Sequence, residues 1–333
     1  MPIPVPTTTP TNDGIIGSKE ELILALNGEI YDASSVYGPI ETWDVTRVDN
    51  FEGLFSLNAP AAGSTFDVAN FNEDISAWDT SSVTTFKETF YGADKFNQNL
   101  SGWDVSKSDS FYGTFRDAHA FNSVVSTWDV QGIISLERMF MDAWNFNQDV
   151  SNWDVSSCKN FVRMFKNTPF NRPLSNWNEK LLSTQNLNFM FDEANQFNQD
   201  ITGWNFDSSL TSMRGTFKAA VMFNQDISVW NIDKVRTFEE TFFGANSFNQ
   251  NLCAWGNKMR TDVQVTTTTM FTGANLSIPI VVCLATGDSL HFTARLPHLQ
   301  QKRFSVVRNV VDFSQALACL ISHNPSCRWH DDP

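Results

Sequence analysis

Aromatic, aliphatic and polar residues recur along this chain in a fixed order, with a period of about 25 residues. The segment that begins at Phe96 reads FNQNLSGWDV, and matching segments begin at Phe121 and Phe146. A period in this range is typical of proteins that stack one supersecondary unit on the next. The tryptophan of the segment recurs in phase at Trp43, Trp78, Trp103, Trp128, Trp153, Trp177, Trp204, Trp230 and Trp255.

The first half of each unit follows the tryptophan. A polar stretch leads to two apolar residues, which lie eight and twelve positions beyond Trp78 as Phe86 and Phe90. A spacing of four places both side chains on one face of a helix. The pattern therefore predicts two to three turns of helix per unit, too short to be stable without packing.

The second half runs from the recurring phenylalanine to the tryptophan. Its apolar positions, such as Phe96, Leu100 and Trp103, show neither strict alternation nor a helical stripe. We interpret it as a turn followed by a very short strand near the tryptophan, which pairs in parallel with its neighbours at a spacing of about 4.8 Å. The predicted fold class is thus α/β, a solenoid with one short strand and one short helix per unit.

An asparagine follows the phenylalanine in all eight later units. We predict a structural ladder, in which buried amides bond to backbone groups of the turn and of the next unit. The motifs lack the Ser or Thr that N-glycosylation requires two residues further on. The predicted ladder consists of Asn72, Asn97, Asn122, Asn147, Asn171, Asn198, Asn224 and Asn249.

The composition divides the chain into four parts. Residues 1–13 are rich in Pro and Thr and are predicted to be a disordered lead. Residues 14–35 are predicted to hold a capping helix, because Ser18 to Glu21 form a capping-box sequence. The solenoid of about nine repeats is expected over 36–275, and 276–333 form either an atypical C-terminal cap or an extension.

Charge and hydropathy restrict the partners. The net charge of −14 argues against a nucleic-acid ligand, which favours a basic patch. No apolar run approaches the 18 or more residues of a membrane span. The first residues show no charged start and no apolar segment, so no signal peptide is visible. The five cysteines form no CxxC pair, and Cys158 is expected to be a small buried apolar side chain.

The segments FNQNLSGWDVS (Phe96–Ser106) and FYGTFRDAHAFN (Phe111–Asn122) resemble the BspA-like leucine-rich-repeat surface proteins, also called DUF285 or mycoplasma lipoprotein-type repeats. The start YGPIETWDV (Tyr37–Val45) is similar to the first unit of such proteins. The resemblance covers residues 18–275. It implies a leucine-rich-repeat-like right-handed solenoid, a cell-surface or extracellular location, and a role in adhesion or protein binding. It supplies no catalytic residues.

Candidate metal sites are weak. Four acidic residues recur at one register and are candidates for a calcium-binding edge, but Asn99, Val124, Pro173 and Asn251 interrupt the row. His323 and His330 lie near Cys319 and Cys327 with no spacing typical of a metal site. We therefore expect no metal, no cofactor and no catalytic residue. The four acidic residues are Asp74, Asp149, Asp200 and Asp226.

Trp144 is the one tryptophan of the repeats that is out of phase. It lies two residues before Phe146, where other units carry varied residues such as His119, Thr168 and Asn195. Variation predicts an exposed position, and exposed aromatic residues often mark binding surfaces. The alternative is a partly buried loop side chain. We predict Trp144 and His119 as binding residues on one face.

Three functions are compatible with these features. The first is a non-enzymatic interaction or adhesion module that binds a protein or glycan at a cell surface through its variable positions. The second is a polysaccharide-acting enzyme on a solenoid scaffold, which needs two acidic residues facing each other across a groove. The third is a purely structural spacer.

Overall fold

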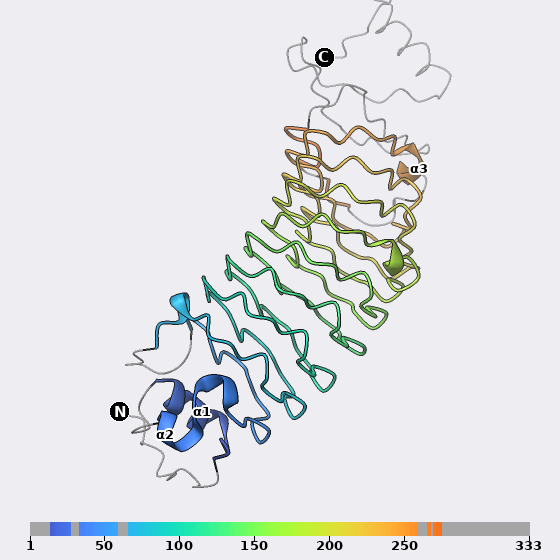
Figure 1. Ribbon diagram of the computed structural model, residues 1–333. Helices are drawn as coiled ribbons and strands as arrows, with labels where there is room; N and C mark the ends of the chain where they lie inside the picture. Colours follow the sequence, from blue (N-terminus) through green and yellow to red (C-terminus); the bar gives the residue numbers. More distant parts are fainter. Residues whose placement is uncertain are drawn as a thin grey trace, which may run out of the picture.

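The computed structural model describes residues 14–27, 33–58, 66–256, 258, 265–267 and 269–274. The chain winds as a stack of coils that begins beside the two N-terminal helices (Figure 1). The predicted lead, 1–13, and the predicted terminal segment, 276–333, lie outside the described residues. The helical elements are α1 (Lys19–Leu26), α2 (Ala33–Tyr37), η1 (Ile40–Thr42), η2 (Val68–Asn70), η3 (Ser175–Trp177) and α3 (Cys253–Gly256).

Two columns of phenylalanine rings run through the interior of the stack. The rings of Phe90 and Phe115 lie 5.4 Å apart in one column, and those of Phe96 and Phe121 lie 6.3 Å apart in the other. Within one unit the two columns touch, because Phe115 stacks on Phe121 at 3.7 Å. Each ring is thus packed by rings of its own unit and of both neighbours, and the core is continuous from unit to unit.

The in-phase tryptophans form a third column, and from Trp78 on each is tied to the unit before it, whereas the indole N–H of Trp43 donates to Gly38 of its own unit at 2.9 Å. The indole N–H of Trp103 donates to the carbonyl oxygen of Ile75 at 3.1 Å, and that of Trp128 donates to Leu100 at 2.9 Å. A buried indole needs an acceptor for its single donor. From Trp78 on the repeat supplies it at the same place in the preceding unit, so the tryptophan fills the core and links two units.

The segment expected to be helical is a run of β-turns. The N–H of Thr89 donates to the carbonyl oxygen of Phe86 at 3.2 Å, and Glu88, the third residue of this turn, has a φ of 51°. A second such turn follows, in which Gly92 has a φ of 71° at the corresponding place. Positive φ at the third residue is what a type II turn requires.

The remaining amides of this segment point along the stack. The N–H of Glu88 donates to Tyr112 and that of Phe90 donates to Thr114, both at 2.8 Å and both in the next unit. A helix would use these N–H groups within its own turn. The predicted helix is therefore wrong, although both phenylalanines of the pair are buried as its spacing suggested.

Among the described residues, parallel pairing between units is limited to isolated bridges of single residues. Asn160, which lies seven residues beyond Trp153, bridges both to Ser135 before it and to Asn186 after it. The described residues around Trp153 form no strand, so the predicted strand near the tryptophan is misplaced. The handedness of the winding and the leucine-rich-repeat class stay predictions.

The eight asparagines after the phenylalanines form a column along the surface. The N–H of Asn147 donates to Oδ1 of Asn122, and Oδ1 of Asn147 accepts from the N–H of Asn171, both at 2.9 Å. Beside this column, Nε2 of Gln148 donates to the carbonyl oxygen of Asn122 at 2.7 Å. The asparagine side chains are exposed or half-buried, and not buried as predicted, because they cover the backbone from outside.

Helix α1 covers the first end of the stack. The side chain of Ser18 accepts from the N–H of Glu21 at 3.1 Å, and the Glu21 carboxylate accepts from Gly17 at 2.8 Å. Leu22 of the helix joins the same core as the repeats.

Further along the chain Cys158 is buried, as expected for a small apolar side chain. Its burial raises the pKa of the thiol to about 12, which leaves it unreactive.

The turn geometry makes a prediction about glycine. Gly244 has a φ of 68° and room for a methyl group, so Gly244→Ala should cost about 1–2 kcal/mol through backbone strain alone. Gly102 lies in a turn without positive φ and also has room, so Gly102→Ala should change stability by less than about 0.5 kcal/mol. Urea unfolding measures both, and equal effects would contradict the turn assignment.

The asparagine column makes a second prediction. Asn147→Ala removes the acceptor of an inter-unit bond and should cost about 1 kcal/mol, within the usual range for one hydrogen bond. Asn147→Asp keeps an oxygen in the same place and should be milder. The midpoint of urea unfolding reports both. If the two substitutions destabilise alike, the side-chain oxygen is not what the column needs.

Candidate functional site

Trp144 lies in a turn that leaves the core and returns to it. The N–H of Phe146 donates to the carbonyl oxygen of Ala143 at 3.0 Å, and both of these side chains are buried. The residues between them point outward, and the side chain of Trp144 is 56% exposed. Its indole N–H has no acceptor among the described residues, whereas the indole N–H groups of all nine in-phase tryptophans donate.

His119 lies one unit before Trp144 on the same face, and the two rings are stacked. Their centroids are 3.6 Å apart at an angle of 19°. The rings of Phe121 and Phe146 in the same two units are 6.1 Å apart, so the rings of His119 and Trp144 lie closer together than the stacked rings of the core. On its other side His119 contacts Asp94 through Nδ1, and this hydrogen bond lowers the pKa of the Asp94 carboxyl. Three consecutive units thus hold the indole in place.

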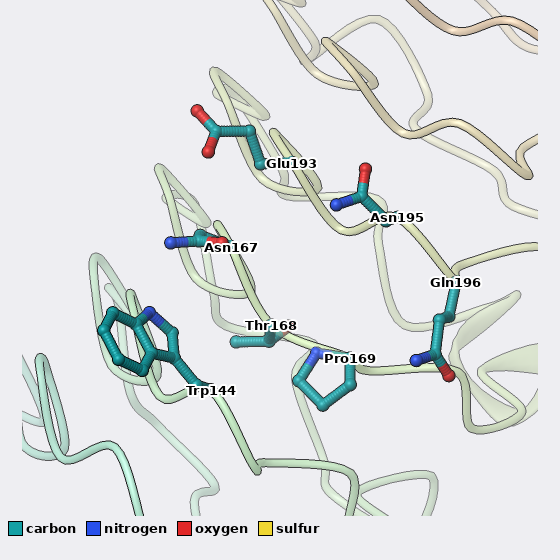
Figure 2. A pocket seen from close by; sticks show the side chains of 7 residues that line it. All are labelled: Trp144, Asn167, Thr168, Pro169, Glu193, Asn195 and Gln196. Carbon is teal, nitrogen blue, oxygen red and sulfur yellow. The ribbon is translucent and has the colours of Figure 1, made fainter.

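A hollow of about 360 Å³ lies on the other side of Trp144, toward the next units. Figure 2 shows the residues around it, with the indole at one end and the two amides Asn195 and Gln196 at the other. Thr168 forms its floor, and this side chain is 3% exposed. The seven lining residues are Trp144, Asn167, Thr168, Pro169, Glu193, Asn195 and Gln196.

The hollow exists because one turn is a residue shorter than its neighbours. The outward turn has five residues between Phe140 and Phe146, but only four between Phe165 and Phe170. Thr168 takes the buried place that Ala143 has in the preceding unit, and its hydroxyl donates to Phe165 at 2.8 Å. Thr168 therefore corresponds to Ala143 and not to Trp144. The sequence analysis placed Thr168 and Trp144 at equivalent positions and was wrong on this point. No side chain is left to project beside the indole.

The rim of the hollow is polar and nearly neutral. The side chains of Asn195 and Gln196 are exposed and make no hydrogen bond within the part of the chain that the structure describes. The Glu193 carboxylate pairs with the ammonium group of Lys166 at 3.1 Å. The amide nitrogen of Asn167 donates to a carboxylate of the preceding unit at 2.8 Å. The free groups are thus two amides and the indole N–H.

A second hollow, of about 280 Å³, lies on the His119 side of the indole. Its lining includes Asp94, Lys95 and Asn145, so Trp144 separates a charged hollow from a nearly neutral one. Asp94 interacts with both His119 and Lys95. The sequence predicted that Trp144 and His119 share one face, as the stacked rings do, and their role in binding stays a prediction. It did not predict the hollows, and the overlooked signal for the first of them was the shortened turn.

The four acidic residues that recur at one register, the candidates for a calcium-binding edge, stabilise turns. The carboxylate of Asp149 accepts from the N–H of Ser151 at 2.8 Å, and Asp74 and Asp200 make the same contact two residues on. Hydrogen bonds from Ser76 lower the pKa of Asp74. The described residues contain no cluster of ligands for a metal ion and no helix with the length and hydropathy to cross a membrane. His323 and His330 lie outside the described residues.

Comparison with known proteins gave one result. A family model described as "Mycoplasma protein of unknown function, DUF285" matches residues 24–132, 109–189 and 180–278, in three overlapping segments. The matches begin within the last turn of α1 and cover the described repeats. No curated protein and no solved structure matches the chain.

Two tryptophans should respond in opposite ways to truncation. Trp153 is 1% exposed, so Trp153→Ala should cost about 3–5 kcal/mol through the cavity that it leaves. Trp144 is 56% exposed and stacks on His119 at the surface, so Trp144→Ala should cost less than about 1 kcal/mol. Thermal unfolding compares the two, and a similar loss from both would place Trp144 in the core.

Proposed function

This chain belongs to the DUF285 repeat family, and we propose that its repeats form a non-enzymatic interaction module that holds its partner at the face around Trp144. The partner is a protein or a glycan at a cell surface or outside the cell. The location follows the resemblance to the BspA-like surface proteins. The rigid stack supplies the frame, and the positions that vary between units supply the contacts.

The exposed and braced indole of Trp144 is the observation that carries this proposal. An exposed tryptophan normally loses side-chain entropy when it binds. Here the stack on His119, which Asp94 fixes from behind, already holds the ring. Large aromatic residues that lie centrally between adaptable polar groups are typical of binding hot spots. The amides of Asn195 and Gln196 are such groups.

The ionisable groups near the indole support a binding role over a catalytic one. The alternative, a polysaccharide-acting enzyme, needs one carboxylic acid and one free carboxylate across a groove. Asp94 is engaged by His119, and its lowered pKa makes it a poor acid. Glu193 is paired with Lys166. A purely structural spacer, the other alternative, does not explain why side chains from three consecutive units hold an exposed tryptophan in place.

A binding screen with a matched pair of variants tests the proposal. The full chain and its Trp144→Ala and Val229→Ala variants are applied to arrays of glycans and of extracellular proteins. Val229 is 65% exposed, away from both hollows, and serves as the control. We expect partners that bind the wild type and the control alike but lose about fivefold or more with Trp144→Ala.

Two results would count against the module. One is that Trp144→Ala retains every partner of the wild type, which would move the contact surface elsewhere. The other is that the full chain retains nothing on either array while the protein is folded by circular dichroism, which would favour the spacer.

A further inference from the structure

We propose that the hollow between Trp144 and Asn195 is a sugar subsite that takes one neutral pyranose ring, gluco-configured, of a glycan. The inference rests on the proposed function and names the ligand class of the same face. It follows from the orientation of the indole, the gap left by the shortened turn and the chemistry of the rim.

The indole presents one free face to the hollow. His119 covers the opposite face at 3.6 Å, and the hollow lies on the Thr168 side of the ring. A pyranose with equatorial hydroxyls has flat faces made of axial C–H groups. Such a face packs on an aromatic ring, buries apolar area, and leaves the hydroxyls at the edge of the stack.

The shortened turn leaves room in the column of outward side chains. Asp94, His119 and Trp144 occupy this column in three successive units, and Asn195 occupies it two units further on. In the unit between, Thr168 is directed inward and Pro169 keeps close to the backbone. A sugar ring in the hollow would take the place of the missing side chain and continue the stack.

The rim offers what hydroxyl groups need. The amides of Asn195 and Gln196 each carry a donor and an acceptor without a partner among the described residues, and the indole N–H adds a donor. Vicinal equatorial hydroxyls also donate and accept, so both sides of each contact are satisfied. Pro169 gives a second apolar surface beside the ring.

A cationic side chain fits this hollow less well. Cation–π binding on Trp144 would be expected to use Glu193 as counter-charge. Glu193 is already paired with Lys166, whose ammonium group also bonds Asp192 at 2.5 Å. An added ammonium group would have to share Glu193 with Lys166, and because it carries no acceptor it would leave the amide N–H groups of Asn195 and Gln196 without partners. A neutral ligand with many hydroxyls meets neither cost.

The test uses the full chain with four soluble probes: cellotriose, chitotriose, mannotriose and a lysine-rich peptide. Titration calorimetry and saturation-transfer NMR report the binding. Gluco-configured rings have only equatorial hydroxyls, whereas mannose carries one axial hydroxyl that would disturb the flat face. We expect cellotriose or chitotriose to bind with a Kd below about 10 mM, and mannotriose about fivefold or more weakly.

Three variants locate the ring. Trp144→Ala should weaken binding about tenfold or more, and Trp144→Phe, which keeps a flat apolar face, should weaken it less. Insertion of one alanine between Thr168 and Pro169 restores the turn length of the neighbouring units, so the protein should fold and the hollow should close. We expect this insertion to abolish binding. Val229→Ala should bind as the wild type does.

The outcomes separate this inference from the function on which it rests. If none of the sugars binds below about 10 mM, or only the peptide binds, the sugar subsite is wrong. A protein partner that still needs Trp144 would then leave the interaction module standing. Sugar binding that is unchanged by Trp144→Ala and by the insertion would overturn the assignment of the site. Failure of both the array screen and the sugar titrations would remove both proposals.

Discussion

The stack depends on hydrogen bonds that run from the backbone of one unit to the backbone of the next. In each run of turns every second N–H points along the stack, as Glu88 does to Tyr112 and Gly113 does to Glu137 at 3.0 Å. The intervening N–H groups close the turns within their own unit. Almost every backbone donor in this segment is thereby satisfied without a helix or a regular sheet, which is the condition for burying such a segment.

The columns of identical side chains follow from this constraint. Once the backbones are in register, residues 25 positions apart lie above one another, and each type can bond to the next unit in the same way. The indole N–H of the tryptophan donates to a backbone carbonyl oxygen inside the stack, and the side-chain oxygen of the asparagine accepts from a backbone N–H at the surface. The hydroxyl of Thr114 donates to the carbonyl oxygen of Phe86 within the core at 2.9 Å. The same register allows phenylalanine rings to stack without a gap. Stability is therefore distributed over many equal contacts between nearest neighbours.

The sequence was sufficient for the period, the buried apolar residues and the family, but not for the burial of the asparagines or for the local backbone. Two successive turns bring Phe86 and Phe90 to the same side just as one helical turn would, so their spacing could not distinguish the two. Recurring glycines at one register, such as Gly92, Gly244 and Gly273, carried the missing signal. It was obscured because Asp142 and Ala219 adopt positive φ at that register without being glycine.

The candidate site also has one part that the sequence could predict and one part that it could not. Trp144 stood out because it breaks the repeat, and its exposure depends only on that local position. The hollow beside it depends on a turn that lacks one residue in the next unit. Recognising this from the sequence requires an alignment that places the gap before Pro169 and leaves Thr168 in the core. Such an alignment follows from the burial of Thr168, which only the structure gives.

The shortened turn also bears on how such arrays can change during evolution. Tandem repeats gain and lose units by unequal recombination, and the matched register of the units means that the core tolerates such events. The indole belongs to one unit and the short turn to the following one. Duplication of either unit alone would lengthen the stack and still leave one indole beside one short turn, whereas duplication of the two units as a pair would copy both together. The number of hollows in a lineage would thus rise only when the pair is copied, and loss of either unit would remove the hollow.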